Sequence, residues 1–216
     1  TQQNYFPLSN ENVIFYIIAY LVGGIPFGYL IVKRFKINLL EIGSGSIGAT
    51  NVYRALKLQT PYAKKLSILT IILDSTKGMI VVLAAKVMGL SYETQWAIAV
   101  LSVLGHCYSP YLNFKGGKGV STAIGSTILL VPLEGIIGLI AWFITGKVFK
   151  VSSLSSLIGV SIGIISSFFI PHFSPAISIV SQVGTHTPLI ILLCLIIYTH
   201  IPNIIRLITN QEGKIL

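Results

Sequence analysis

Hydrophobic residues in this chain form long runs that charged residues rarely interrupt. Asn12–Val32 and Thr94–Phe114 contain no Asp, Glu, Lys or Arg, and Leu66–Ala85 contains only Asp74 and Lys77. A run of about 20 apolar residues is the length that an α-helix needs to cross a bilayer. The pattern therefore predicts three transmembrane helices at these positions.

Two further regions are longer and contain prolines. Gly119–Thr145 is interrupted at Pro132 and Glu134, which predicts two short helices joined by a turn, or one re-entrant unit. Val151–Ile205 carries no formal charge and is too long for one helix. A polar break divides it into two spans and is marked by Pro171, Pro175 and Pro188. We therefore predict an all-α integral membrane protein of seven transmembrane helices, some of them short, in a single domain, residues 1–216.

Lysine and arginine follow alternate spans of this prediction. With seven spans, Glu11, Glu93 and Glu134 fall on one face of the membrane and thirteen basic residues fall on the other. Cytoplasmic loops are enriched in Lys and Arg, so the basic face is expected to be cytoplasmic, with the N-terminus outside and the C-terminus inside. The thirteen are Lys33, Arg34, Lys36, Arg54, Lys57, Lys64, Lys65, Lys115, Lys118, Lys147, Lys150, Arg206 and Lys214.

Composition supports the membrane prediction. Hydrophobic residues make up 53% of the chain and charged residues 10%, where a soluble domain has about 25% charged residues. The net charge of +9 is dispersed among apolar runs, which favours anionic ligands and a lipid bilayer over nucleic acid. Cys107 and Cys194 fit no metal-binding or disulfide spacing, so we expect no metal and no cofactor. The first twelve residues lack the features of a signal peptide.

The segment "GSGSIG", residues 43–48, spells the G-x-G-x-x-G fingerprint of dinucleotide-binding domains. That fingerprint follows a strand and has an acidic residue about 20 positions further on. The preceding "FKINLLEI" could form a short strand, but the next acidic residue is Asp74, inside a predicted span. We therefore reject a dinucleotide site.

The same glycines suit a phosphate. Glycine lets successive backbone N–H groups turn toward an anion, hydroxyl and amide groups add donors, and arginine adds a forked cation. The alternative is an interfacial turn with no ligand. The candidate phosphate-binding residues here are Ser44, Gly45, Ser46, Gly48, Thr50, Asn51 and Arg54.

A second glycine-rich segment, "KGGKG", lies at the start of the fourth predicted helix. It is not a Walker A loop, because position 112 is Leu. Free N–H groups at a helix start favour an anion, whereas the alternative is a basic loop that only follows the charge rule for cytoplasmic loops. Its candidate residues are Lys115, Gly116, Gly117, Lys118 and Gly119.

Two weaker polar clusters fall on the same predicted face. "VSSLSSL", residues 151–157, contains serines that equally suit helix packing. His200, Asn203 and Arg206 follow at i, i+3 and i+6 and could bind an anion or transfer a proton. Because all four clusters share one face with few carboxylates, the ligand should carry phosphate.

Three other charged or titratable groups lie within predicted spans. Asp74 and Lys77 are three residues apart on one helical face, and we expect them to form a structural pair. His106 suits packing or function equally, while His172 and His186 lie near the outer loop, away from the clusters.

"GSGSIGATNVYRAL", "GHCYSPYLNFKGGKGVST" and the final H-x-x-N-x-x-R-L closely resemble the bacterial acyl-phosphate:glycerol-3-phosphate acyltransferases. The resemblance covers nearly the whole chain. It implies seven membrane helices in the inner membrane and an active site that faces the cytoplasm. It also implies transfer of a fatty acyl group from acyl phosphate to the 1-hydroxyl of glycerol 3-phosphate, which gives lysophosphatidic acid for phospholipid synthesis. Neither acyl-CoA nor acyl carrier protein would be the donor.

The resemblance also assigns roles by position. Ser44 and Arg54 match essential residues of the first motif, and the Gly116–Gly119 segment, with Lys118, matches the glycerol-phosphate loop. Ser153 matches a phosphate-contacting serine, His200 and Asn203 match the last motif's polar pair, and Glu212 matches a structural glutamate. Departures from the family pattern are Ser46 in place of Asn, "SLSS" in place of "SLAS", and Ile201, Pro202 and Asn210 in the last motif.

The residues also bear on mechanism. Position 111, five residues after His106, is Tyr, so the His-x4-Asp pair of other acyltransferases is missing, and no serine or cysteine has a visible His/acid relay. We therefore expect substrate positioning without a covalent acyl-enzyme. Two other functions use the same residues: a transporter of a phosphorylated metabolite and a non-catalytic subunit that binds anionic lipid.

Overall fold

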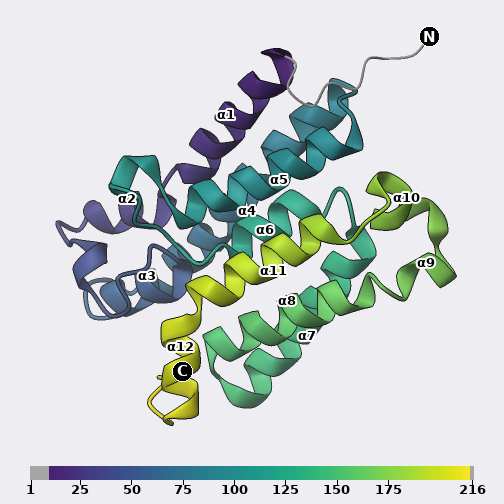
Figure 1. Ribbon diagram of the computed structural model, residues 1–216. Helices are drawn as coiled ribbons and strands as arrows, with labels where there is room; N and C mark the ends of the chain where they lie inside the picture. Colours follow the sequence, from purple (N-terminus) through teal and green to yellow (C-terminus); the bar gives the residue numbers. More distant parts are fainter. Residues whose placement is uncertain (1–9, 215–216) are drawn as a thin grey trace.

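The computed structural model describes residues 10–214, and every element in that range is helical (Figure 1). This confirms the all-α prediction. In chain order the elements are α1 (Asn10–Gly24), α2 (Phe27–Lys33), η1 (Leu39–Glu41), α3 (Ala49–Leu56), α4 (Ala63–Val87), α5 (Tyr92–Cys107), η2 (Pro110–Leu112), α6 (Val120–Thr127), α7 (Pro132–Phe149), α8 (Ser152–Ser166), α9 (Ile170–Phe173), η3 (Pro175–Ile177), α10 (Ile179–Val183), α11 (Thr187–Thr199) and α12 (Ile201–Ile208).

Three helical stretches in the described range are long and apolar enough to cross a membrane: Asn12–Lys33, Ala63–Val87 and Pro132–Phe149. Helices α11 and α12 make a fourth if the pair is one span, because they pass the same test together with a bend of 60° between them. Helix α8 is apolar but shorter. Many large apolar side chains point outward, among them Ile68, Ile72 and Ile80 of α4, as expected of a surface that faces lipid.

Prolines set several helix ends that the apolar runs alone do not show. The first run divides into α1 and α2 at Pro26, and α5 ends at Cys107, before Pro110, rather than continuing to Phe114. Pro202 lies in the first turn of α12, where the bend from α11 occurs. The prediction of a turn before Pro132 is confirmed, since α6 ends at Thr127 and α7 begins at that proline.

The suggested short strand before "GSGSIG" is wrong. That segment forms the 3-10 helix η1, whose start is capped by the side chain of Asn38 through a hydrogen bond from Leu40 N of 3.3 Å. A capping side chain offers the backbone a local alternative to strand pairing.

Helices pack in pairs along the bundle. Helix α1 lies against α5, α4 against α6, and α7 against α8, while α11 contacts both α5 and α8 (Figure 1). The α7–α8 pair approaches closely at glycines: a Cβ on Gly138 would lie 2.9 Å from the carbonyl oxygen of Gly159. Gly159 and Gly163 are therefore small residues that allow this close helix packing. The starts of α3, α6 and α8 and the α11–α12 bend meet around one cavity.

Candidate active site

Asn51 organises the first glycine loop. Its side-chain amide donates hydrogen bonds to the carbonyl oxygens of Leu39 (3.2 Å), Ile42 (2.9 Å) and Ser46 (2.8 Å). Its Oδ1 accepts from the backbone N–H of Ser44 at 3.3 Å. Because these bonds use both ends of a buried amide, Asn51 shapes the loop around the cavity and its donors are already occupied.

Two glycines of this loop adopt conformations that other residues avoid. Gly43 has φ of 55° and Gly45 has φ of 66°, in the left-handed region. Gly48, by contrast, has φ of −74° and precedes the first turn of α3. The loop thus turns at Gly43 and Gly45 and leads directly into α3.

Arg54 lies on α3 and faces the cavity. Within residues 10–214, its half-buried guanidinium makes no hydrogen bond or ion pair. Five N–H donors of a guanidinium suit a phosphate, which can occupy two of them at once. Arg54 is therefore available to an anionic ligand.

The second glycine loop rests on the end of α5. Gly117 N donates to the carbonyl oxygen of His106 at 2.9 Å. A Cβ on Gly117 would lie 2.0 Å from His106 Nε2, and a Cβ on Gly116 would lie 2.2 Å from His106 O. These glycines are needed for close approach to α5, and their predicted role in anion binding stays a prediction. The carbonyl oxygen of Gly116 also accepts a bond of 3.5 Å from Ile47 N, so the two loops touch.

Lys118 leaves this loop and enters the cavity. Its Nζ donates to Asn203 Oδ1 at 2.6 Å, and Asn203 Nδ2 donates in turn to Glu212 Oε1 at 2.6 Å. Burial lowers the pKa of Lys118 to about 8, and the nearby positive charges of Arg206 and Arg54 act in the same direction, against the carboxylate of Glu212. Lys118 is therefore a cation at neutral pH, and it loses its proton at a lower pH than an exposed lysine does.

Glu212 joins three segments at the C-terminal end. Its carboxylate accepts from Ser153 Oγ (2.7 Å), Asn203 Nδ2 (2.6 Å) and Arg206 Nε (2.6 Å). Burial opposes ionisation of this group, but the three hydrogen bonds together hold its pKa below the usual value. Glu212 thus ties α8 to α12, in agreement with the structural role that the resemblance implies, and it occupies the Nε of Arg206.

His200 lies at the bend between α11 and α12. Its Nδ1 is 2.8 Å from the carbonyl oxygen of Ile196, which can only accept, so Nδ1 carries the hydrogen. Nε2 of the neutral ring is then an acceptor. His200 lines the cavity, and it can accept a hydrogen bond from a ligand hydroxyl there.

A buried charged cluster forms part of the cavity wall. Lys77 Nζ lies 2.8 Å from Asp74 Oδ1, which confirms the predicted pair, and 3.0 Å from His106 Nδ1. Lys77 also donates to the carbonyl oxygen of Ile25 at 2.7 Å. His106 therefore connects the charged pair of α4 to the second glycine loop.

The cavity, with a volume of about 180 Å³, brings together residues from all four polar clusters. Among the candidates, its lining includes Ser44, Ser46, Gly48, Thr50, Asn51, Arg54, Lys118, Gly119, Ser153, His200 and Asn203. Outside its lining are Gly45, Lys115, Gly116, Gly117 and Arg206. Thr50 Oγ1 is 2.9 Å from Ser152 Oγ, which joins the first loop to the start of α8.

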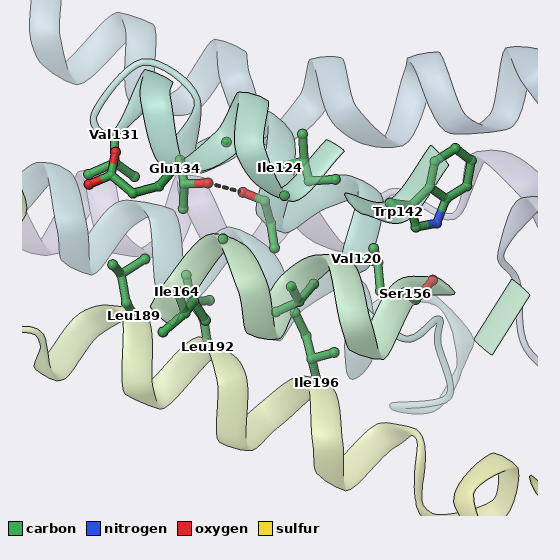
Figure 2. Close-up of a pocket in the computed structure, with 17 residues that line it drawn as sticks. Val120, Ile124, Val131, Glu134, Trp142, Ser156, Ile164, Leu189, Leu192 and Ile196 are labelled. Carbon is green, nitrogen blue, oxygen red and sulfur yellow. Dashed lines mark hydrogen bonds between the residues drawn. The ribbon is translucent and has the colours of Figure 1, made fainter. Parts of the chain in front are cut away.

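An apolar arm extends from this cavity between α6, α7, α8 and α11 (Figure 2). The cavity and the arm share four lining residues, Val120, Ile124, Trp142 and Ser156. Beyond them the arm is lined almost entirely by aliphatic side chains and glycines, and Glu134 and Val131 lie at the end opposite Trp142. The arm is narrow, with an open volume of about 60 Å³. A polar and an apolar compartment are therefore continuous.

The comparisons with known proteins agree on one family. A family model described as glycerol-3-phosphate acyltransferase matches residues 13–210. The chain belongs to the glycerol-3-phosphate acyltransferase family. The family member of Helicobacter hepaticus is 62% identical over 216 residues, which cover 98% of this chain and 96% of the relative. That of Wolinella succinogenes is 53% identical over 211 residues, which cover 97% and 99%.

Solved structures of one family member share the fold. The crystal structure of PlsY (YgiH), an integral membrane glycerol 3-phosphate acyltransferase, in its glycerol 3-phosphate form matches with a TM-score of 0.80. It is 31% identical, and the match covers 96% of each chain. The lysophosphatidic acid form matches with a TM-score of 0.77, the same identity and the same coverage. The integral membrane architecture that we expect of the present chain is therefore supported by its fold as well as by its sequence.

Several residues that line the cavity of the present chain were not predicted from its sequence. Ser75, Ser121 and Ser152 line the polar cavity, and Trp142 lines both compartments. Ser152 directly precedes the candidate Ser153, and Ser121 lies two residues after the candidate Gly119, so their positions at helix starts could have identified them. Trp142 and the arm had no such signal, because apolar residues at helical spacing occur in every membrane span.

Proposed function

We propose that this protein transfers a fatty acyl group from acyl phosphate to the 1-hydroxyl of sn-glycerol 3-phosphate, giving lysophosphatidic acid and phosphate. The observation that carries the proposal is the continuity of the cationic cavity with the apolar arm. Acyl phosphate has a phosphate at one end, which suits the cationic cavity, and a hydrocarbon chain along the rest, which suits the apolar arm. The relative whose crystal structures share the fold, PlsY (YgiH), has a glycerol 3-phosphate form and a lysophosphatidic acid form.

The phosphate groups of both substrates belong in the polar cavity. Arg54 supplies a forked cation that has no partner among the described residues, and Lys118 supplies a second cation from the opposite loop. Ser44 and Ser153 add hydroxyl groups. Because a charged hydrogen bond is about twice as strong as a neutral one, the two cations should dominate phosphate binding.

The acyl chain belongs in the arm. Its open volume of about 60 Å³ is smaller than a long fatty chain needs, so we expect side chains of α6 and α11 to move apart on binding. Trp142, at the junction, would lie beside the first methylenes. This places the acyl carbonyl within the polar cavity, close to the cations.

The reaction follows from this placement. The 1-hydroxyl oxygen attacks the acyl carbonyl carbon, and the bond between that carbon and the phosphate oxygen breaks. The hydroxyl proton passes to the departing phosphate. His200 Nε2 accepts a hydrogen bond from the hydroxyl and orients it, while Arg54 stabilises negative charge on the phosphate.

A covalent acyl-enzyme is not part of the proposal. Among the described residues, no serine that lines the polar cavity is hydrogen-bonded to a histidine. Ser152 pairs with Thr50, and Ser153 pairs with Glu212. A serine nucleophile needs an adjacent base. The carboxylate of Glu212 is a poor one, because it also accepts hydrogen bonds from Asn203 and Arg206 and its pKa lies below the usual value.

We also propose that the chain crosses the bacterial inner membrane seven times as a single domain. The spans would be α1–α2, α4, α5, α6, α7, α8 and α11–α12. This count puts the thirteen basic residues on the side of the polar cavity, which is then cytoplasmic, with the N-terminus outside and the C-terminus inside.

One assay tests the function. Purified protein in detergent receives palmitoyl phosphate and glycerol 3-phosphate, and phosphate release is followed over time. We expect release that depends on glycerol 3-phosphate, with lysophosphatidic acid in equal amount, and no product from palmitoyl-CoA. Binding without release would indicate a transporter or a lipid-binding subunit, and equal product from palmitoyl-CoA would contradict the assigned donor.

A further inference from the structure

Among the described residues, Glu134 is the one ionisable side chain that lines the apolar arm, and the mechanism does not use it. It is 3% exposed, and within the described residues neither carboxylate oxygen has a hydrogen-bond partner. Buried polar groups in native proteins nearly always have partners, so an exception requires an explanation. Its position suggests one, because Glu134 lies at the end of the arm farthest from Trp142 (Figure 2).

We propose that Glu134 closes the arm and sets the length of acyl chain that the enzyme accepts. This inference rests on the proposed acyl-phosphate activity and extends it to substrate selection. A hydrocarbon chain gains free energy for each methylene that it buries against an apolar wall. The carboxyl group offers no such wall, and its volume blocks further advance.

The walls of the arm direct a chain toward this end. Gly135, Gly138, Gly159 and Gly163 line one side, where α7 and α8 approach so closely that a Cβ on Gly163 would lie 3.0 Å from the carbonyl oxygen of Glu134. Aliphatic side chains of α6 and α11 line the other side. A chain that enters at Trp142 therefore meets no polar side chain of α7 before Glu134.

The length of the arm matches part of a fatty chain. Glu134 and Trp142 are eight residues apart on α7, which at a rise of about 1.5 Å per residue spans about 12 Å. A carbon chain with bonds of about 1.52 Å and angles near 111° advances about 1.25 Å per carbon. The arm between these residues therefore holds about nine or ten carbons, beyond those at the junction and in the polar cavity.

Chain-length profiles test the inference. The kcat/KM of wild type is measured for saturated acyl phosphates of increasing even length, with glycerol 3-phosphate saturating. We expect a rise of about fourfold per methylene until the arm is full, followed by a fall. Glu134→Ala removes about 3–4 Å of side chain, which is the length of about two to three carbons, so its optimum should move to the next longer even-numbered chain. The KM for glycerol 3-phosphate should stay the same.

Two control variants test whether a shift in the optimum comes from the size and position of the Glu134 side chain, and a third variant tests the same end of the arm independently. Glu134→Gln keeps the size and polarity of the side chain, so the optimum should stay at the wild-type length. Glu93→Ala removes an exposed carboxylate that does not line the arm, and its profile should match wild type. Leu189→Ala opens the same end of the arm from α11 and should also move the optimum to longer chains, which decides the question if Glu134→Ala does not fold.

The outcomes distinguish this inference from the proposed function. Phosphate release by wild type with an optimum that neither Glu134→Ala nor Leu189→Ala shifts overturns the role of Glu134 alone. A wild-type profile with no optimum also overturns it, because the chain would then leave the arm sideways into the bilayer. No release from any acyl phosphate overturns the proposed function together with the inference.

Discussion

The polar cavity and the apolar arm meet at Trp142, and both contain buried carboxylates. These carboxylates differ in whether other side chains pair with them. In the cavity wall, Asp74 pairs with Lys77 at 2.8 Å, and Glu212 accepts three hydrogen bonds. In the arm, the carboxylate of Glu134 has neither a hydrogen-bond partner nor an ion-pair partner among the described residues. Most polar side chains of the cavity are therefore hydrogen-bonded to one another or to the backbone, whereas the guanidinium of Arg54 has no partner within residues 10–214 and is available to a ligand.

The contrast assigns different tasks to the two regions. A preorganised network can stabilise charge on phosphate without rearranging, which is the principal source of rate enhancement in charge-stabilising enzymes. The arm has no comparable network and can adapt to a chain by moving side chains. Mutations in the cavity should therefore affect stability or turnover strongly, whereas mutations in the arm should affect selection among donors.

The largest effect should be a loss of stability when a buried carboxylate of the cavity wall loses its partner, as Glu134 in the arm lacks one among the described residues. Lys77→Met leaves Asp74 buried without its partner, and removal of one partner of a buried ion pair costs about 3–5 kcal/mol of unfolding free energy. Denaturant unfolding in detergent measures the loss. Lys77→Met combined with Asp74→Leu should recover most of it, because no unpaired charge remains. A single variant as stable as wild type would show that the pair contributes nothing.

The next largest effect should be on turnover. Arg54→Ala removes the unpartnered cation of the cavity, and loss of one such charge-stabilising donor costs about 10²–10³ in kcat, or about 3–4 kcal/mol. The matched control is Lys57→Ala, which removes an exposed cation three residues further on and should leave kcat unchanged. Normal turnover in Arg54→Ala with an intact fold would remove Arg54 from the site.

A smaller effect is expected in the arm. A Cβ on Gly159 would lie 2.8 Å from Trp142 Cβ, so Gly159→Ala overpacks the α7–α8 seam and should cost about 1–3 kcal/mol of stability. The KM for palmitoyl phosphate should rise roughly tenfold, as for one lost methylene contact, while the KM for glycerol 3-phosphate stays constant. Gly146→Ala is the control, since its Cβ meets Ser155 Oγ at an ordinary 3.4 Å. An equal rise in both KM values would show that the compartments are not separate.

The smallest effect is a pH dependence. Burial lowers the pKa of Lys118 to about 8, so its proton, and with it a cation of the cavity, is lost as pH rises through that value. The kcat/KM for glycerol 3-phosphate should therefore fall about tenfold per pH unit above pH 8. Lys118→Arg keeps its charge at these pH values, so this decline should disappear. A decline of the same midpoint in Lys118→Arg would assign it to another group.

Sequence reasoning predicted the polar cavity better than the arm. Glycines, hydroxyl groups and cations at one predicted face are rare in membrane spans, so the segments around Ser44, Lys118 and His200 were identified from their composition. The arm consists of Gly, Ile, Leu and Val from four helices. Such residues also pack every other helix pair, so only the folded arrangement shows which of them enclose a space.

Individual roles within the cavity also required the structure. The sequence places Asn51 and Arg54 three residues apart. It cannot show that Asn51 donates to three backbone carbonyl oxygens while Arg54 has no partner in the part of the chain that the structure describes. Likewise, the sequence cannot show that Gly117 lies against His106, an approach that only glycine allows. Prolines also moved helix ends away from the ends of the apolar runs: α5 ends at Cys107, before Pro110, although its apolar run continues to Phe114.

The most direct test of the central claim compares two donors that share an activated phosphate. Phosphate release started by glycerol 3-phosphate is measured with palmitoyl phosphate and with acetyl phosphate, which has no chain to fill the arm. The account predicts release from palmitoyl phosphate and a kcat/KM for acetyl phosphate that is lower by several orders of magnitude, since each lost methylene costs about 0.8 kcal/mol. Equal kcat/KM values for the two donors would contradict it.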